Sequence, residues 1–150
     1  MFSLAFTGLA ILMAYTFSGI FSNGNVAVLD DLRRKRSGRG RLIASIQGFG
    51  FAFVGEYEFC DSETAETIGL LDWSKKHPDA TFVYLWIECG GGDCVHSGFV
   101  FRDGTVIHVE PVTNGDCETR EPLRRLLRHL GVELDARGFF EPLTRQYFGA

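Results

Sequence analysis

Three side chains that can accept or donate protons lie close together in the sequence, on either side of a predicted turn. They are His96, His108 and Glu110, and the turn is the dipeptide Asp103-Gly104. A two-residue turn would place the two histidines on opposite faces of the hairpin, because side chains alternate along a strand. A turn longer by one residue, with a bulged Gly104, would place all three side chains on one face. The sequence allows both turns, and only the longer one lets these side chains act together.

The stretch from His96 to His108, HSGFVFRDGTVIH, resembles the two-histidine hairpin of the permuted papain-like thiol enzymes typified by lecithin:retinol acyltransferase. In that family the catalytic cysteine follows at the start of a helix, and here Cys117 precedes a predicted helix. The resemblance implies a hydrolase or acyltransferase with Cys117 as nucleophile and His96 as general base. His108 or Glu110 would orient that base. Only eight residues separate His108 from Cys117, where the family has several strands.

The cysteines allow three interpretations. A four-residue GGGD loop would pair Cys89 directly with Cys94, which suits a disulfide across the hairpin in an oxidising compartment. Cys89, Cys94 and His96, together with Cys60 or Cys117, could instead bind zinc, although the first two cysteines are more widely spaced than in the usual motifs. All of the cysteines could also be thiols packed in the core. We expect no bound metal ion and no cofactor.

Acidic side chains gather where a predicted strand meets a predicted helix. They are Glu56, Glu58, Asp61, Glu63 and Glu66. Residues 61–110 as a whole carry nine acidic and three basic side chains, a local charge of −6. Complementary charge steers association between proteins, so these residues predict a binding surface for a basic protein partner.

We therefore predict a non-enzymatic protein-recognition domain, similar in character to the small immunity and antitoxin proteins that neutralise a partner. A cysteine-dependent hydrolase or acyltransferase is the alternative. The chain has 150 residues, of which 45% are hydrophobic, and a net charge of −4. This apolar content excludes a disordered protein, and the negative charge makes a nucleic-acid partner unexpected.

The N-terminal segment carries no charged side chain before Asp30. As a helix, residues 2–22 would extend about 31 Å, enough to cross a bilayer. The basic sequence RRKRSGRGR follows at residues 33–41 and predicts a membrane anchor with the rest of the chain in the cytoplasm. A helix buried in a soluble cytoplasmic domain and a signal peptide are the alternatives.

The remainder of the chain has the pattern of an α+β domain. Predicted strands occupy residues 42–59 (one bent strand or two), 81–89, 94–102 and 105–112, and predicted helices begin near Asp61 and Thr119. We expect strand(s), a helix, a three-strand meander and a helix, with the helices packed on one face of an antiparallel sheet. The expected division is an apolar N-terminal helix at 1–25, a basic linker at 26–41 and the α+β domain at 42–150.

The first two strands of the meander are expected to have one aliphatic and one aromatic face. Val83, Leu85 and Ile87 alternate with Phe82 and other aromatic residues. The aliphatic face suits a helix. The aromatic face must be covered by another segment, such as the N-terminal one, or serve as a binding surface.

Overall fold

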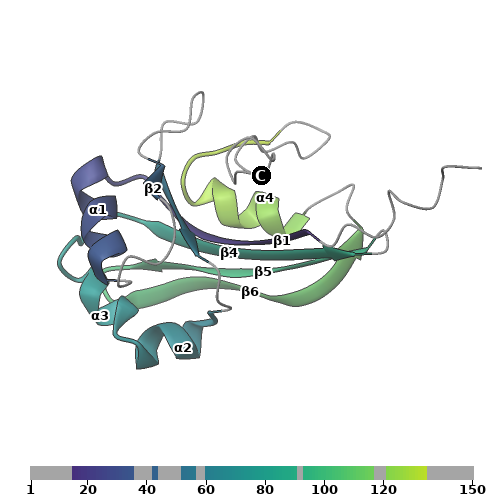
Figure 1. Ribbon diagram of the computed structural model, residues 1–150, viewed down its shortest axis with the longest axis horizontal. Helices are drawn as coiled ribbons and strands as arrows, with labels where there is room; N and C mark the ends of the chain where they lie inside the picture. Colours follow the sequence, from purple (N-terminus) through teal and green to yellow (C-terminus); the bar gives the residue numbers. More distant parts are fainter. Residues whose placement is uncertain are drawn as a thin grey trace, which may run out of the picture.

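An antiparallel sheet with the strand order β2-β3-β1-β4-β5-β6 forms the centre of the molecule (Figure 1). The structure, a computed structural model, describes residues 15–35, 42–43, 52–56, 60–90, 93–116 and 121–134. The strands are β1 (Tyr15–Ser22), β2 (Leu42–Ile43), β3 (Ala52–Glu56), β4 (Phe82–Gly90), β5 (Asp93–Arg102) and β6 (Thr105–Asp116). The helices are α1 (Val26–Lys35), α2 (Ser62–Thr67), α3 (Leu70–Ser74) and α4 (Glu121–Arg128). The predicted α+β class is confirmed.

Helices cover both faces of this sheet, and the expectation that they share one face is wrong. One core cluster packs residues of α1, α2 and α3 against the aromatic side chains Phe82 and Tyr84. The other packs Leu126 and its neighbours in α4 against Val83 and Leu85. Figure 1 shows α4 above the sheet and α2 below it. Both faces are apolar, so each needs its own cover.

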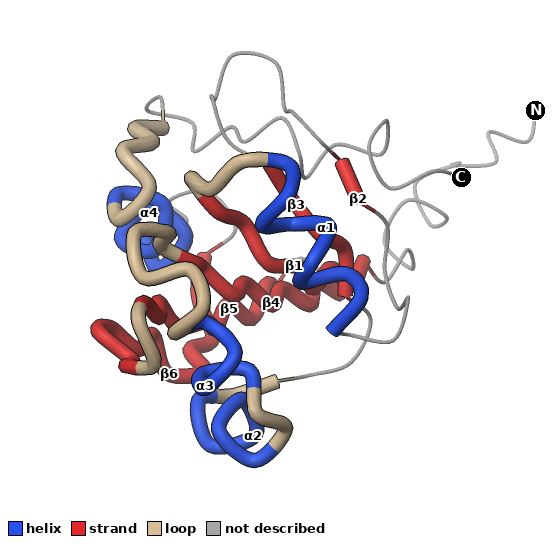
Figure 2. Tube along the Cα trace, turned by 90° about the vertical axis from the view of Figure 1, so that its left-hand side faces the viewer, coloured by secondary structure: helices blue, strands red, loops and turns tan. Residues whose placement is uncertain are grey.

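The aromatic face is covered by two groups of helices at different ends of the sheet. Figure 2 shows α2 and α3 at the β6 end and α1 closer to β1 and β3. Trp73 of α3 stacks edge-on against Phe82, with the ring centroids 5.2 Å apart. Its Nε1 donates a hydrogen bond of 2.9 Å to Asp31 of α1. This hydrogen bond joins the two groups of helices.

The predicted apolar helix over residues 2–22 is wrong over its last eight residues. Tyr15–Ser22 form β1, which lies between β3 and β4 in the middle of the sheet. Ile20 and Phe21 are both buried, and they point to opposite faces. A strand buried on both faces is apolar without alternation, so its pattern does not distinguish it from a helix. Residues 2–14 of the predicted helix lie outside the described residues, and no described helix is both long and apolar enough to cross a membrane.

Much of the segment predicted as a basic linker, residues 26–41, is helix α1. Asn25 begins the helix, because its side-chain oxygen accepts a hydrogen bond of 3.1 Å from the backbone N of Val28. Leu29 and Leu32 are fully buried in the core. The basic residues of its last turn are exposed, so the start of the basic sequence forms the solvent-exposed end of a helix.

The predicted register of the first hairpin of the meander is confirmed. Ile87 pairs with His96, and Leu85 pairs with Gly98. A Cβ atom at Gly98 would lie 2.3 Å from the backbone oxygen of Tyr84 and 2.7 Å from Cδ1 of Leu126. Glycine at this position therefore allows α4 to pack closely against the sheet.

Candidate functional site

A β-bulge decides which side chains share a face in the second hairpin of the meander. Asp103 and Gly104 both have positive φ angles, 48° and 77°, and form the two-residue turn. Val106 pairs with Phe101, but His108 pairs with Val100, so β6 contains one extra residue between these pairs. The bulge moves His108 to the other face. The turn is thus the shorter of the two expected, yet the side chains still share a face.

His96, His108 and Glu110 all lie on the face of the sheet that α4 covers. His96 pairs with Thr113 and His108 with Val100, so four positions of β5 separate the two histidines. This spacing corresponds to roughly 13 Å along the strand. The two histidines therefore share a face without being neighbours, and Glu110 lies between them.

Glu110 is the centre of a polar cluster that joins β6 to α4. Its side chain is only 6% exposed. Nε of Arg125 donates to Oε1 at 2.5 Å, and Nη2 donates to Oε2 at 3.0 Å. Nε2 of His108 lies 2.9 Å from Oε1. Both carboxylate oxygens are therefore engaged by cationic or polar groups.

These contacts set the protonation state of the cluster. Burial opposes ionisation of Glu110, but the hydrogen bonds from Arg125 and His108 outweigh it, and the pKa of Glu110 lies below its ordinary value of 4.5. The ring of His129 lies 5.2 Å from that of His108, between centroids. Burial and the nearby His108 lower the pKa of His129. A glutamate with a lowered pKa and two occupied oxygens is suited to holding the fold together rather than to accepting protons.

The nucleophile implied by the resemblance, Cys117, lies outside the described residues. The strand before it is described as far as Asp116, which pairs with Asp93 at the end of the sheet. The described helix α4 begins at Glu121, and Thr119, its expected cap, also lies outside the described residues. His96, the implied base, is 2% exposed.

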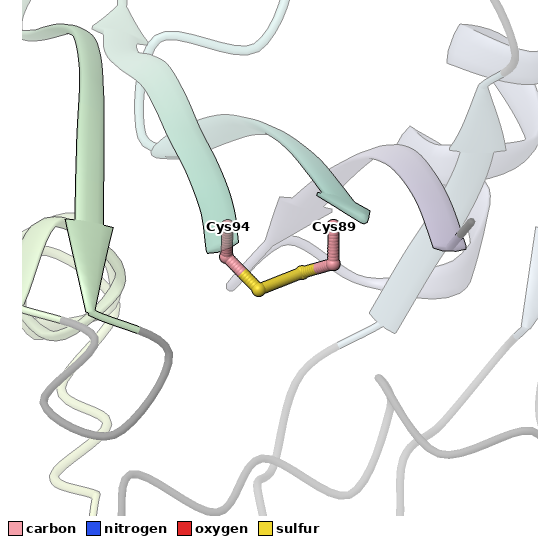
Figure 3. Close-up of a disulfide and its surroundings, with 2 residues drawn as sticks. All are labelled: Cys89 and Cys94. Carbon is pink, nitrogen blue, oxygen red and sulfur yellow. A yellow bond between two sulfur atoms is a disulfide. The ribbon is translucent and has the colours of Figure 1, made fainter. Parts of the chain in front are cut away.

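Cys89 and Cys94 form a disulfide across the ends of β4 and β5, as one of the three interpretations expected (Figure 3). Their Cα atoms are 4.1 Å apart. Since both sulfurs are in this bond, the interpretation of these two residues as zinc ligands is wrong. Within the described part of the chain, no three His, Cys, Asp or Glu side chains are grouped so that they could hold a metal ion.

The acidic residues predicted as a binding surface are described only in part. Asp61 is the N-cap of α2, and its Oδ1 accepts a hydrogen bond of 2.7 Å from the backbone N of Thr64. That hydrogen bond lowers the pKa of Asp61. Glu63 and Glu66 are exposed on the same helix. The side chains of the other two predicted residues, Glu56 and Glu58, are not described. The backbone of Glu56 lies in β3, opposite Ser18.

An exposed apolar surface on β6 was missed by the sequence analysis. Four large hydrophobic residues are exposed in the described ranges, and three of them lie in β6; the fourth is Val26 of α1. Ile107, Val109 and Val112 are 50%, 50% and 61% exposed. The signal in the sequence was the apolar residues on both faces of the last strand of the meander. One face of such a strand remains uncovered when the strand is at the edge of a sheet.

A pocket of about 150 Å³ lies where this apolar surface meets the start of α2. We call it the β6–α2 pocket; its lining residues are Cys60, Asp61, Ser62, Ser97, Gly98, Phe99, Val109, Glu110, Pro111 and Val112. Cys60 is buried, and its backbone N donates a hydrogen bond of 3.1 Å to Oη of Tyr84. This hydrogen bond anchors the segment before α2 to the centre of the sheet.

The described molecule therefore has two places where functional groups gather, on opposite faces of one edge of the sheet. The Glu110 cluster ties β6 to α4, and the β6–α2 pocket opens among exposed valines and acidic residues. Comparisons of this chain with protein-family models, with curated proteins and with solved structures found no match.

Proposed function

We propose that this chain is a protein-recognition domain that binds a basic partner through α2 and the exposed side of β6. One observation carries the proposal: exposed apolar side chains of β6 and an acidic helix meet at a pocket. Contiguous exposed apolar residues are rare on monomeric proteins and mark interaction sites. A neutralising role, like that of an immunity or antitoxin protein, fits such a surface.

The form of β6 favours binding through side chains over the addition of another strand. Its pairing with β5 contains two register shifts, one of them beside Pro111. A bulge and a proline both interrupt the regular row of backbone groups that a new strand would need. The side chains of Val109 and Val112 are therefore the part of β6 that a partner would contact.

The charge beside these valines favours a basic partner. Glu63 and Glu66 are exposed on α2, Asp61 is exposed at its N-cap, and the lowered pKa of Asp61 favours its ionised form. Complementary charges raise the association rate and exclude partners of the same sign. The apolar residues would supply the affinity and α2 the selectivity.

The proposal can be tested by selecting displayed random peptides on the immobilised protein. We expect the selected peptides to be rich in Lys and Arg, with aliphatic or aromatic residues beside them. Glu63→Lys should slow their association by roughly tenfold at low salt. Glu133→Lys makes the same change of charge at an exposed residue after α4, on the other face of the sheet, and should have little effect.

Two results would contradict the proposal. One is a selection that yields only neutral or acidic peptides. The other is an association rate that does not respond to salt or responds equally to the two charge reversals, because electrostatic steering by α2 is screened by ions and depends on position.

A cysteine-dependent enzyme is the second candidate, and one observation favours it. The β6 bulge places His108 and Glu110 on the same face as His96 of β5, and β6 is the strand that precedes Cys117. Site-resolved alkylation below neutral pH, read by mass spectrometry, tests this candidate. Fast labelling of Cys117 would indicate a thiolate with a lowered pKa. Labelling of Cys117 no faster than that of an ordinary exposed thiol would exclude it.

A further inference from the structure

We infer that the β6–α2 pocket receives a single arginine or lysine side chain of the partner protein. This inference rests on the proposed function and specifies which chemical group the surface recognises. The size of the pocket, the mostly apolar character of its lining and the exposed Asp61 in that lining support it.

The size of the pocket matches one side chain. Sites for small organic ligands and cofactors usually enclose about 300–1,000 Å³. The β6–α2 pocket has a volume of about 150 Å³. It is too small for such a ligand and large enough for one long side chain inserted from a neighbouring protein surface.

The lining of the pocket is mostly apolar, and it includes the exposed, negatively charged Asp61. Buried Phe99 of β5 lines it together with Val109, Pro111 and Val112 of β6. Long cationic side chains bury their aliphatic stems against such walls and keep the charged end at a polar rim. The pocket thus offers an environment for both parts of an arginine or lysine.

The carboxylate of Asp61 is oriented and charged before a partner arrives. Its Oδ1 accepts the hydrogen bond from Thr64 that caps α2, and this bond also lowers its pKa. Thr64 acts on this carboxylate through both its backbone and its side chain, and a carboxylate has about four acceptor positions, which leaves capacity for a guanidinium or ammonium group. The other carboxylate of the lining, Glu110, already binds Arg125 with both oxygens. Asp61 is therefore the group that a cation would meet.

The lining argues against an anionic ligand. None of the residues that line this pocket is Lys, Arg or His. An anion would approach the exposed Asp61 with no basic side chain in the lining to offset the charge, which is unfavourable. A neutral apolar side chain would fit the walls but would leave the charge of Asp61 without a partner.

Nuclear magnetic resonance titrations with three short peptides on the full chain test the inference. The peptides are acetyl-Gly-Arg-Gly-amide and the same peptide with citrulline, which keeps the length of the side chain without its charge, or with norleucine, which keeps only an aliphatic stem. We expect the arginine peptide to produce saturable shifts of the amide signals of Cys60, Ser62 and Val109, with a dissociation constant on the order of millimolar. Citrulline and norleucine should bind roughly threefold more weakly, as expected for one partly exposed ion pair.

A matched pair of variants separates the pocket from the general charge of α2. Asp61→Asn keeps a good helix cap and removes the charge, so the arginine peptide should bind roughly threefold more weakly. Glu66→Gln removes a charge from the same helix at a residue outside the pocket, and should leave the affinity nearly unchanged. If Asp61→Asn disturbs the fold, the comparison of the arginine and citrulline peptides on the unchanged protein still tests whether the pocket recognises the positive charge.

Several results would overturn the inference. These are the absence of saturable shifts at the pocket, equal affinities for arginine and citrulline, and equal losses in the two variants. The proposed function survives any of these if displayed basic peptides still bind and respond to Glu63→Lys. It fails together with the inference if no basic peptide binds at all.

Discussion

The two faces of β6 differ in how completely their side chains are buried and bound by other residues of the chain. Toward α4, buried Glu110 is engaged by Arg125 and His108. Toward α2, Val109 and Val112 remain half-exposed beside a pocket. A buried charge must be paired for the chain to fold, whereas an exposed apolar side chain has no such requirement. The conspicuous titratable cluster therefore holds β6 to α4, and the plainer valine surface is the one that we propose for binding.

The largest expected effect on stability comes from a substitution at the closest contact between the sheet and α4. Gly98→Ala would place a Cβ atom 2.3 Å from a backbone oxygen and 2.7 Å from Leu126. Neither α4 nor β4 can move away easily, so we expect the free energy of unfolding to fall by about 3 kcal/mol. Urea denaturation followed by circular dichroism measures this. A loss below about 0.5 kcal/mol would show that α4 is not packed tightly on the sheet.

The next largest effect is expected from Arg125→Met, which leaves the buried carboxylate of Glu110 with His108 alone. The loss of a partner from a buried ion pair is strongly destabilising, but Arg125 is itself 46% exposed. We therefore expect a loss of about 2 kcal/mol in the free energy of unfolding. Arg128→Met removes an exposed arginine from the same helix and is the control. Equal losses in the two variants would contradict a special role for the Glu110 cluster.

The pH dependence of stability should separate the two faces in the same way. The pKa of Glu110 is lowered in the folded protein, so its contribution to stability is complete above its ordinary value of 4.5. That contribution is lost as the pH falls through the lower pKa of the folded state. Glu110→Gln should therefore flatten the dependence of the free energy of unfolding on pH below about 4.5, measured by denaturation across that range. An unchanged slope would mean that Glu110 is not ionised in the folded state.

The smallest effect on stability is expected on the other face. Val112→Ser replaces a side chain that is 61% exposed, so the free energy of unfolding should change by less than about 0.5 kcal/mol. Binding of the selected basic peptides should nevertheless weaken by roughly threefold, because the wall of the pocket loses apolar area. Denaturation and peptide titration on the same sample compare the two effects. A stability loss as large as that of Arg125→Met would contradict the view that only the face of β6 toward α4 is important for stability.

The meander could be predicted from the sequence because its strands alternate clearly and its turns carry strong glycine signals. The pairing of Cys89 with Cys94 follows from that pattern alone. The β6 bulge could not be predicted, since no glycine or proline marks residue Ile107. The Glu110 cluster depends on that bulge and on the distant Arg125, so its geometry is a property of tertiary packing. The central strand β1 was mistaken for a helix because both of its faces are buried.

The position of β1 between β3 and β4 affects how the chain folds during its synthesis. Tyr15 of β1 pairs with Cys89, 74 positions later in the chain (89 − 15). The sheet therefore stays open in the middle until β4 has left the ribosome, and such distant pairing slows folding. The hairpins of β4, β5 and β6 involve near neighbours and can form among themselves. Loss of the first 22 residues by proteolysis would take away β1, the strand that joins β3 to β4, and divide the sheet in two.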